Sequence, residues 1–341
     1  MAATGATRAA ALRWDGQRLH VLDQTRLPAA ERVLELRDAG QVSDALRRLA
    51  VRGAPLIGVA AGYGLAMELA REPTPAALER AGALLKAARP TAVNLAWAVD
   101  RVAAAARRAA GGDMAAAARA EAEAIEAENA AAGHALAGLG ACLLAELGAQ
   151  RLLTHCNTGE LACGARSSAL GVIAELAARQ PGVAVLVCET RPLLQGARLT
   201  TWELAREGIP HELIVDAAAP GLIRRGQVDA VVVGFDRMAA NGDAANKVGT
   251  YGLALAAGAA GIPFVFAGPT SSIDPALASG AEIQIEERDP GEVLRAAEAP
   301  AGTAVRNPAF DVTPAELVTA VVTERGIARP VSTQSLAALL R

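Results

Sequence analysis

The chain has 341 residues, of which 52% are hydrophobic and 3% are aromatic, and its formal net charge is −3. This length exceeds what one hydrophobic core usually supports, so two domains are expected. A small negative charge and few aromatic side chains do not suit electrostatic binding or base stacking, which excludes nucleic acid as a partner and favours a small-molecule ligand.

The first third of the chain indicates a short hairpin followed by helices. Two apolar-rich segments, residues 11–14 and 19–23, flank Asp15-Gly16, and Asp-Gly is a hairpin signal. From residue 46 to about residue 148 the pattern is rich in Ala and Leu at helical spacing, with breaks at residues 53–55, 72–75, 89–90 and 111–112. We therefore predict a mainly helical N-terminal domain, residues 1–132, with a small antiparallel sheet.

The second half alternates short apolar runs with longer helical patterns. The runs lie at residues 152–153, 183–187, 213–215, 230–233 and 263–266, and helical spacing is clear at residues 168–178 and 253–260. Buried strands that alternate with helices are typical of a mostly parallel sheet built from βαβ units. The sequence thus predicts an α/β protein whose C-terminal domain, residues 133–341, has a Rossmann-like sheet.

Signals for membranes, export and metal ions are lacking in the sequence. No apolar run has the length of a membrane span, and the N-terminal residues lack the apolar segment of a secretory signal. The four cysteines and four histidines show no metal-binding spacing and no disulfide framework. We therefore expect a cytoplasmic protein with no membrane partner and no metal site.

Polar residues and glycines follow each predicted strand. They occupy residues 154–159, 189–196, 216, 234–243 and 268–272. Ligands of open parallel sheets bind outside the carboxyl ends of the strands, so these segments predict one site. None of them contains a dinucleotide fingerprint, a P-loop or a nucleophile elbow, which disfavours a dehydrogenase, an NTPase and a hydrolase and predicts no cofactor.

Five sequence runs resemble one known family. They are Val-Arg-Gly-Ala-Pro-Leu-Ile-Gly at residues 51–58, Arg-Pro-Thr-Ala-Val-Asn at 89–94, His-Cys-Asn-Thr-Gly at 155–159, Glu-Thr-Arg-Pro-Leu-Leu-Gln-Gly-Ala-Arg at 189–198, and the run from Asp236 to Tyr251. In this order they resemble the methylthioribose-1-phosphate isomerases of methionine salvage. That family is similar to regulatory subunits of the eukaryotic guanine-nucleotide exchange factor for initiation.

The resemblance implies conversion of 5-methylthioribose 1-phosphate into 5-methylthioribulose 1-phosphate, with Cys156 and Asp236 as the catalytic residues. The phosphate on the anomeric oxygen prevents simple ring opening, so an acid must protonate the ring oxygen before hydrogen moves from C2 to C1. Asp236 is expected to be this acid, with a pKa raised by partial burial among residues 231–235. Cys156, as a thiolate, is expected to be the base, and a direct hydride shift from C2 to C1 is the alternative.

The resemblance also implies which residues hold the sugar phosphate: Arg52, Gly53, Ala54, Arg89, Gln195, Asn246 and Lys247. Residues 52–54 precede Pro55, which favours the first turn of a helix, so amides and a guanidinium can meet an anion there. Asn246 and Lys247 are expected to open the helix that follows residues 241–243. Asp243 is expected to orient this loop.

Other substrates and a different class of function remain open. Isomerases of 5-deoxyribose 1-phosphate and of ribose 1,5-bisphosphate are similar to this family. The chain has only two lysines, Lys86 and Lys247, which disfavours a second phosphate on the substrate. A non-catalytic regulatory subunit would not need Cys156 and Asp236 together. A homodimer is expected from the resemblance alone.

Overall fold

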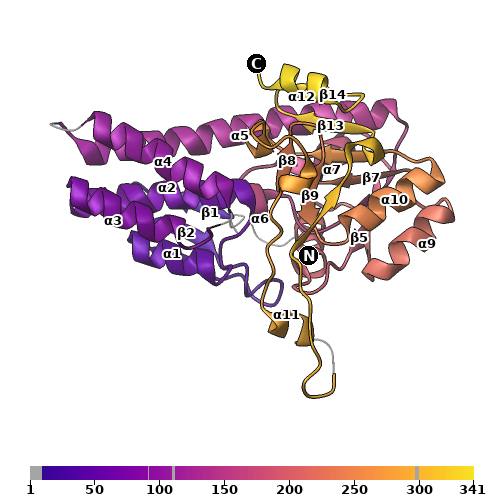
Figure 1. Ribbon diagram of the computed structural model, residues 1–341, viewed down its shortest axis with the longest axis horizontal. Helices are drawn as coiled ribbons and strands as arrows, with labels where there is room; N and C mark the ends of the chain where they lie inside the picture. The colour runs from indigo at the N-terminus through magenta and orange to yellow at the C-terminus, as the bar shows by residue number, and fades with distance from the viewer. Residues whose placement is uncertain (1–9, 91, 110–111, 296–298) are drawn as a thin grey trace, which may run out of the picture. The chain divides into compact units, whose positions relative to one another are not determined.

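The computed structural model describes residues 10–90, 92–109, 112–295 and 299–341 (Figure 1). The chain folds as two compact units. The first ends at Asn129 and also contains Glu160–Gly164, and the second consists of Ala130–Gly159 and Ala165–Arg341. The inclusion of Glu160–Gly164 in the first unit was not expected. Helix α6 (Glu160–Cys163) contacts helix α2 (Ala54–Arg71), but the two helices are far apart in sequence, so no local pattern predicts this contact.

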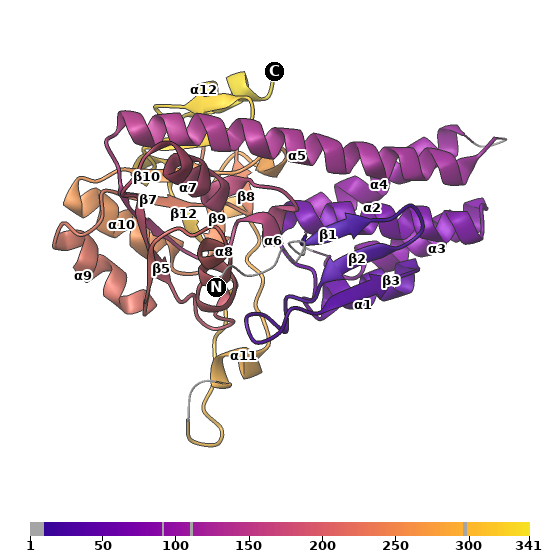
Figure 2. The ribbon, with the colours of Figure 1, turned by 180° about the vertical axis from the view of Figure 1, so that it is seen from behind.

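The first unit begins with a three-stranded antiparallel sheet in the order β1-β2-β3, formed by Leu12–Trp14, Leu19–Leu22 and Val33–Leu36. Figure 2 shows these strands against the helices of the same unit, and β2 contacts α2. The hairpin of β1 and β2 was predicted. Strand β3 was not, because four residues with two exposed side chains give too short an alternation to recognise.

The helices of this unit begin and end where proline, glycine and capping residues require. They are α1 (Ala39–Arg47), α2, α3 (Pro75–Lys86), α4 (Val93–Arg108) and α5 (Met114–Glu146), which continues into the second unit. The Thr74 side chain caps α3 by accepting the amide of Ala77, and Pro75 fits the first turn because it lacks an amide. The expected helical breaks are confirmed, apart from residue 111, which lies outside the described residues.

The second unit contains a seven-stranded sheet in the order β14-β13-β10-β7-β4-β5-β6. All neighbouring strands are parallel except β13 and β14. The strands are β4 (Arg151–Thr154), β5 (Ala184–Cys188), β6 (His211–Ile214), β7 (Ala230–Val233), β10 (Phe264–Ala267), β13 (Ala320–Thr323) and β14 (Gly326–Ala328). The mostly parallel α/β fold is therefore confirmed.

Strand order shows that the sheet is doubly wound. From β4 the chain moves outward through β5 to β6, then returns to place β7 on the other side of β4 and continues through β10 to β13. The direction of winding thus reverses between β4 and β7. Such a reversal separates the loops that leave the two neighbouring strands and creates a crevice for ligands at their carboxyl ends.

Successive residues of the central strands belong to different layers of the core. Leu152 packs with α7 (Ser168–Arg179) and the end of α5, whereas Leu153 packs with α9 (Ala219–Arg224) and α10 (Thr250–Ala260). Figure 1 shows α9 and α10 side by side, and the two helices are in contact. Because both faces of the sheet are covered, its central strands are apolar throughout.

A four-stranded sheet in the order β11-β8-β9-β12 extends from the same unit. Its strands are Ile273–Asp274, Arg237–Ala239, Ala244–Lys247 and Phe310–Thr313. The expectation that Asn246 and Lys247 open a helix was wrong, because both pair with β12 as the last residues of β9. Helix α10 begins only at Thr250, after Gly249 turns the chain with a φ of 105°.

The remaining helices of the second unit are short. They are α8 (Thr201–Arg206), α11 (Pro290–Leu294) and α12 (Thr333–Leu339), and a π-helical turn at Gly196–Thr200 leads into α8. Among the described residues, none of the helices combines the length and the apolar character that crossing a membrane requires.

Candidate active site

Cys156 and Asp236 lie beyond the two strands at which the winding of the sheet reverses. Cys156 follows β4, which ends at Thr154, and Asp236 follows β7, which ends at Val233. The strands pair in parallel, with Leu153 opposite Val231. Their following loops also touch, since a Cβ atom added at Gly234 would lie 2.5 Å from the Cγ2 atom of Thr158. The geometry therefore places both residues at the crevice where ligands of doubly wound sheets bind.

The backbone at Cys156 has an unusual conformation, and side chains of other segments hydrogen-bond to it. Its φ is 63°, a left-handed conformation that is uncommon outside glycine, and the residue is 8% exposed. The Cys156 amide donates to the Thr190 hydroxyl at 2.9 Å, and its carbonyl accepts from the Thr200 hydroxyl at 2.6 Å. Side chains from two other segments thus satisfy the peptide groups of Cys156.

The loop that follows β5 is also strained. Thr190 has a φ of 66° and Leu194 has a φ of 58°. A positive φ is a pronounced outlier for a β-branched residue such as threonine, and outliers of this kind concentrate at functional sites. Their occurrence beside Cys156 supports the hypothesis that these loops form a functional region.

Asp236 departs from expectation because its side chain is exposed. The apolar residues before it are buried, and burial ends at Phe235. The Asp236 amide donates to the Ala245 carbonyl at 2.9 Å, which leads the chain into β8 with the carboxyl group outside the core. The predicted partial burial of Asp236 among residues 231–235 was therefore wrong.

Buried polar atoms without a hydrogen-bond partner gather on the loops beyond the strands. The described residues contain six such side-chain atoms, and four of them belong to Thr158, Arg191, Gln195 and Ser272, which follow β4, β5 and β10. Buried polar atoms in folded proteins are almost always paired. Unpaired atoms concentrated at one edge of a sheet fit a site that a polar ligand completes. Gln195, a predicted substrate-binding residue, is one of the four.

Asn246 and Lys247 are held by neighbours of the same unit. The Asn246 amide donates to the Thr250 hydroxyl at 2.9 Å, and Asn246 is 1% exposed. The Lys247 ammonium donates to the Ala309 carbonyl at 2.9 Å and lies 4.6 Å from the centre of the Phe310 ring. Both side chains are thus kept in defined positions at the end of β9.

The other predicted substrate-binding residues belong to the first unit. Arg52 donates from Nε to the Gln24 side chain at 3.0 Å. Gly53 has a φ of 98°, and a Cβ atom there would lie 2.4 Å from the backbone of Ala162, so only glycine fits. Helix α2 starts at Ala54, as expected, and Arg89 is half-buried between α3 and α4.

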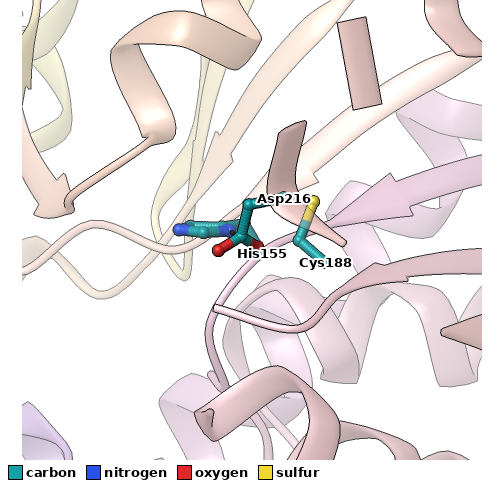
Figure 3. A group of neighbouring side chains, drawn as sticks. All are labelled: His155, Cys188 and Asp216. Atoms are coloured by element: carbon teal, nitrogen blue, oxygen red, sulfur yellow. Dashed lines mark ion pairs between the residues drawn. The ribbon is translucent and has the colours of Figure 1, made fainter. Parts of the chain in front are cut away.

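His155, Cys188 and Asp216 bring three possible metal-ligating atoms within 4.8 Å of one another (Figure 3). Their donor atoms already have other roles. Both Asp216 oxygens accept backbone amides at 2.8 Å, and Nε2 of His155 lies 2.9 Å from the Val248 carbonyl. Burial raises the pKa of the Cys188 thiol to about 12, so this group is a neutral thiol in the metal-free protein. The cluster therefore fits a structural role better than metal binding.

Asp243 ties together three segments near the small sheet. Its carboxylate accepts the Asn241 side chain at 2.8 Å and the amides of Gly280 and Ala315 at 3.0 Å each. Burial alone raises the pKa of Asp243, but these hydrogen bonds outweigh burial, and the pKa is lowered below 3.8. These contacts agree with the expected role of Asp243 in orienting its loop.

Replacing Asp243 by Ala is expected to lower the free energy of unfolding by about 2 kcal/mol at pH 7, because two amides lose a charged acceptor. A lowered folded-state pKa stabilises the protein above the unfolded value of 3.8, and this contribution disappears as the pH falls through the folded-state pKa. The thermal unfolding midpoints of wild type and Asp243→Ala should therefore converge in acid. A constant difference between pH 7 and pH 3 would contradict this explanation.

The sequence did not reveal the side chains that support Cys156. Thr190 and Thr200 bind its peptide group, and the side chain of Asn157 donates to Glu203 at 2.6 Å in the buried region behind it. The position of residues 189–196 after a strand was a usable signal for Thr190. Glu203 offered none, because only the packing of α8 brings it to Asn157.

Comparisons with known proteins show which family the chain is similar to. The sequence profile described as the Initiation factor 2 subunit family matches residues 50–330. A methylthioribose-1-phosphate isomerase from Anaeromyxobacter sp. (strain K) is 51% identical over 94% of each chain, and a 5-deoxyribose 1-phosphate isomerase from Moorella thermoacetica is 47% identical over 97% of each chain. The crystal structure of a 5-methylthioribose 1-phosphate isomerase from Pyrococcus horikoshii OT3 has a TM-score of 0.90 and 37% identity, covering 98% of this chain and 96% of that one.

Proposed function

The chain belongs to the Initiation factor 2 subunit family, and from its similarity to named isomerases we propose that it is an aldose-ketose isomerase that converts 5-methylthioribose 1-phosphate into 5-methylthioribulose 1-phosphate in methionine salvage. The observation that carries this proposal is the placement of Cys156 and Asp236 after the two strands that flank the reversal of winding. Relatives named as this isomerase support it over nearly the whole chain. A regulatory subunit would not need an acid and a thiol at this point.

In the proposed reaction Asp236 donates a proton to the ring oxygen as its bond to C1 breaks. The C1 atom becomes electron-poor and is stabilised by the oxygen that carries the phosphate. Cys156, as a thiolate, then removes the proton from C2, and the electrons of that C–H bond form an enol phosphate. Proton gain at C1 and proton loss from the C2 hydroxyl complete the ketose. In the alternative, hydrogen moves from C2 to C1 as hydride while the C2 hydroxyl loses its proton.

Turnover in D₂O distinguishes the two routes. Proton transfer through Cys156 is expected to place solvent deuterium at C1 of the product, because an abstracted proton can exchange before it returns. NMR of the product measures this incorporation. A product without deuterium at C1, formed at the normal rate, would favour the hydride shift and leave Cys156 to act on the hydroxyl proton.

We also propose that Arg52, Gly53, Ala54, Arg89, Gln195, Asn246 and Lys247 bind the substrate. The buried and unpaired Oε1 atom of Gln195 supports its part in this set, because a sugar hydroxyl would supply the missing donor. The fixed side chains of Asn246 and Lys247 support theirs, since little conformational freedom is lost on binding.

A 5-deoxyribose 1-phosphate isomerase is a second candidate, favoured by the similarity to the Moorella thermoacetica protein. Steady-state assays of the methylthio, deoxy and 5-phospho sugar phosphates separate these functions. We expect the highest kcat/KM for the methylthio sugar and the lowest for the bisphosphate, because a second phosphate requires extra cations and the loops beyond the strands contain no cluster of lysines. Absence of turnover with all three would favour a regulatory role.

We make three further proposals, of which the first rests on the family resemblance and the other two on the sequence patterns. These are a homodimer, a cytoplasmic location, and an N-terminal domain of residues 1–132 followed by a catalytic domain of residues 133–341. Light scattering of the purified protein tests the first, and a monomer at micromolar concentration would contradict it.

A further inference from the structure

The peptide group of Cys156 depends on side chains from other segments. Its left-handed backbone, with a φ of 63°, lies beyond the end of β4, so the strand cannot hold it there. The amide donates to Thr190 and the carbonyl accepts from Thr200. An unfavourable conformation persists only where the surroundings enforce it, so these contacts decide where the Cys156 side chain points.

Thr190 can perform this role because its hydroxyl is placed with little freedom. The residue is completely buried and has a φ of 66°. Its Oγ1 atom accepts from Cys156, donates to the Cys188 carbonyl at 3.0 Å and lies 3.4 Å from Nδ1 of His155. Threonine disfavours this backbone conformation more than most residues, which indicates that something else holds the loop.

Asp216 is the group that holds it. Asp216 follows β6, the neighbour of β5, and its two carboxylate oxygens accept the amides of Thr190 and Arg191 at 2.8 Å each. Hydrogen bonds to a charged acceptor are stronger than neutral ones. Figure 3 shows Asp216 beside His155, whose Nδ1 atom lies 3.9 Å from the carboxylate.

We infer that Asp216 and Thr190 are positioning residues that orient Cys156 for proton transfer. The inference rests on the isomerase function proposed above. Asp216 clamps the strained loop after β5, the clamped loop presents the Thr190 hydroxyl, and the hydroxyl fixes the Cys156 amide. Neither residue takes or gives a proton in the reaction.

Two substitutions of Thr190 test the chain of contacts. Thr190→Val keeps the shape but removes the hydroxyl, so kcat is expected to fall about 10- to 100-fold with KM nearly unchanged, because the catalytic group is displaced while binding groups remain. Thr190→Ser keeps the hydroxyl and should retain most of the activity. Thr313→Val is the matched control, because Thr313 is completely buried and its hydroxyl has no partner among the described residues.

A readout that needs no substrate separates this inference from the proposed function. Alkylation of Cys156 by iodoacetamide, followed by peptide mass spectrometry, is expected to be at least about threefold faster in Thr190→Val and Asp216→Asn, because loosening the loop exposes the buried thiol. Thr190→Ser and Thr313→Val should react like wild type.

The possible outcomes lead to different conclusions. The inference would be overturned if Thr190→Val and Asp216→Asn both kept the kcat and the alkylation rate of an active wild type. Equal losses in Thr190→Val and Thr190→Ser would also overturn it, since the hydroxyl would not be responsible. A wild type that turns over no sugar phosphate would instead overturn the proposed function, while the alkylation rates would still decide whether Thr190 and Asp216 position the thiol.

Discussion

Replacing Cys156 by Ser is expected to reduce kcat by about 10²–10⁴-fold, the range that a well-placed acid or base contributes. Serine is nearly the same size and tolerates the same backbone, so the hydrogen bonds to Thr190 and Thr200 should persist. A hydroxyl is a far weaker proton acceptor than a thiolate at neutral pH. The steady-state rate with 5-methylthioribose 1-phosphate measures the loss.

Cys142→Ser provides a control for the loss of a thiol, because Cys142 is exposed on α5. This variant should retain wild-type kcat, and both variants should unfold at nearly the wild-type temperature. Retained activity in Cys156→Ser would remove Cys156 from the mechanism. A large fall in the unfolding temperature of that variant would instead assign Cys156 a structural role.

Replacing Asp236 by Asn is expected to reduce kcat by a similar factor, about 10²–10⁴-fold, because the amide cannot protonate the ring oxygen. An acid works only when protonated, so its contribution declines as the pH rises. The wild-type profile of kcat against pH should therefore fall on its alkaline side through loss of this proton. The kcat of Asp236→Asn should be low at every pH and should not show this fall on the alkaline side.

Asp229 offers a matched control at the opposite end of β7. Its carboxylate accepts the Arg151 amide at 2.7 Å and the Gln150 amide at 3.1 Å, next to the start of the strand at Ala230. Asp229→Asn should lower the unfolding temperature and leave kcat within about threefold of wild type, since surface-proximal hydrogen bonds affect stability rather than distant chemistry. Equal kcat values for Asp229→Asn and Asp236→Asn would contradict the role of Asp236.

The exposure of Asp236 changes the explanation of how its carboxyl group could stay protonated. Partial burial among residues 231–235 was predicted to raise its pKa, yet the structure leaves the carboxyl group exposed after the buried Phe235. Desolvation of an exposed carboxyl group requires a bound substrate or a closing segment. We therefore expect the pH dependence of kcat, which reports on the bound enzyme, to differ from that of kcat/KM.

Local patterns in the sequence determined the elements of this protein and the region of its site. Proline, glycine and capping residues placed the helical breaks, as at Thr74 and Pro75, because those residues change the local backbone energy. Short apolar runs placed β4, β5, β6, β7 and β10, whereas β13, which is buried and parallel to β10, was not predicted. Polar residues after those strands indicated the edge at which Cys156 and Asp236 lie.

Only the tertiary structure decided which strands are neighbours and which side chains support the site. Strand order, with β7 beside β4, depends on pairing between segments far apart in the chain, and no local pattern encodes it. The same holds for Asp216, Thr190 and Cys156, which follow three different strands and interact only because those strands lie side by side. The exposure of Asp236 was likewise set by the pairing of the next segment with β9, which turns its carboxyl group away from the core.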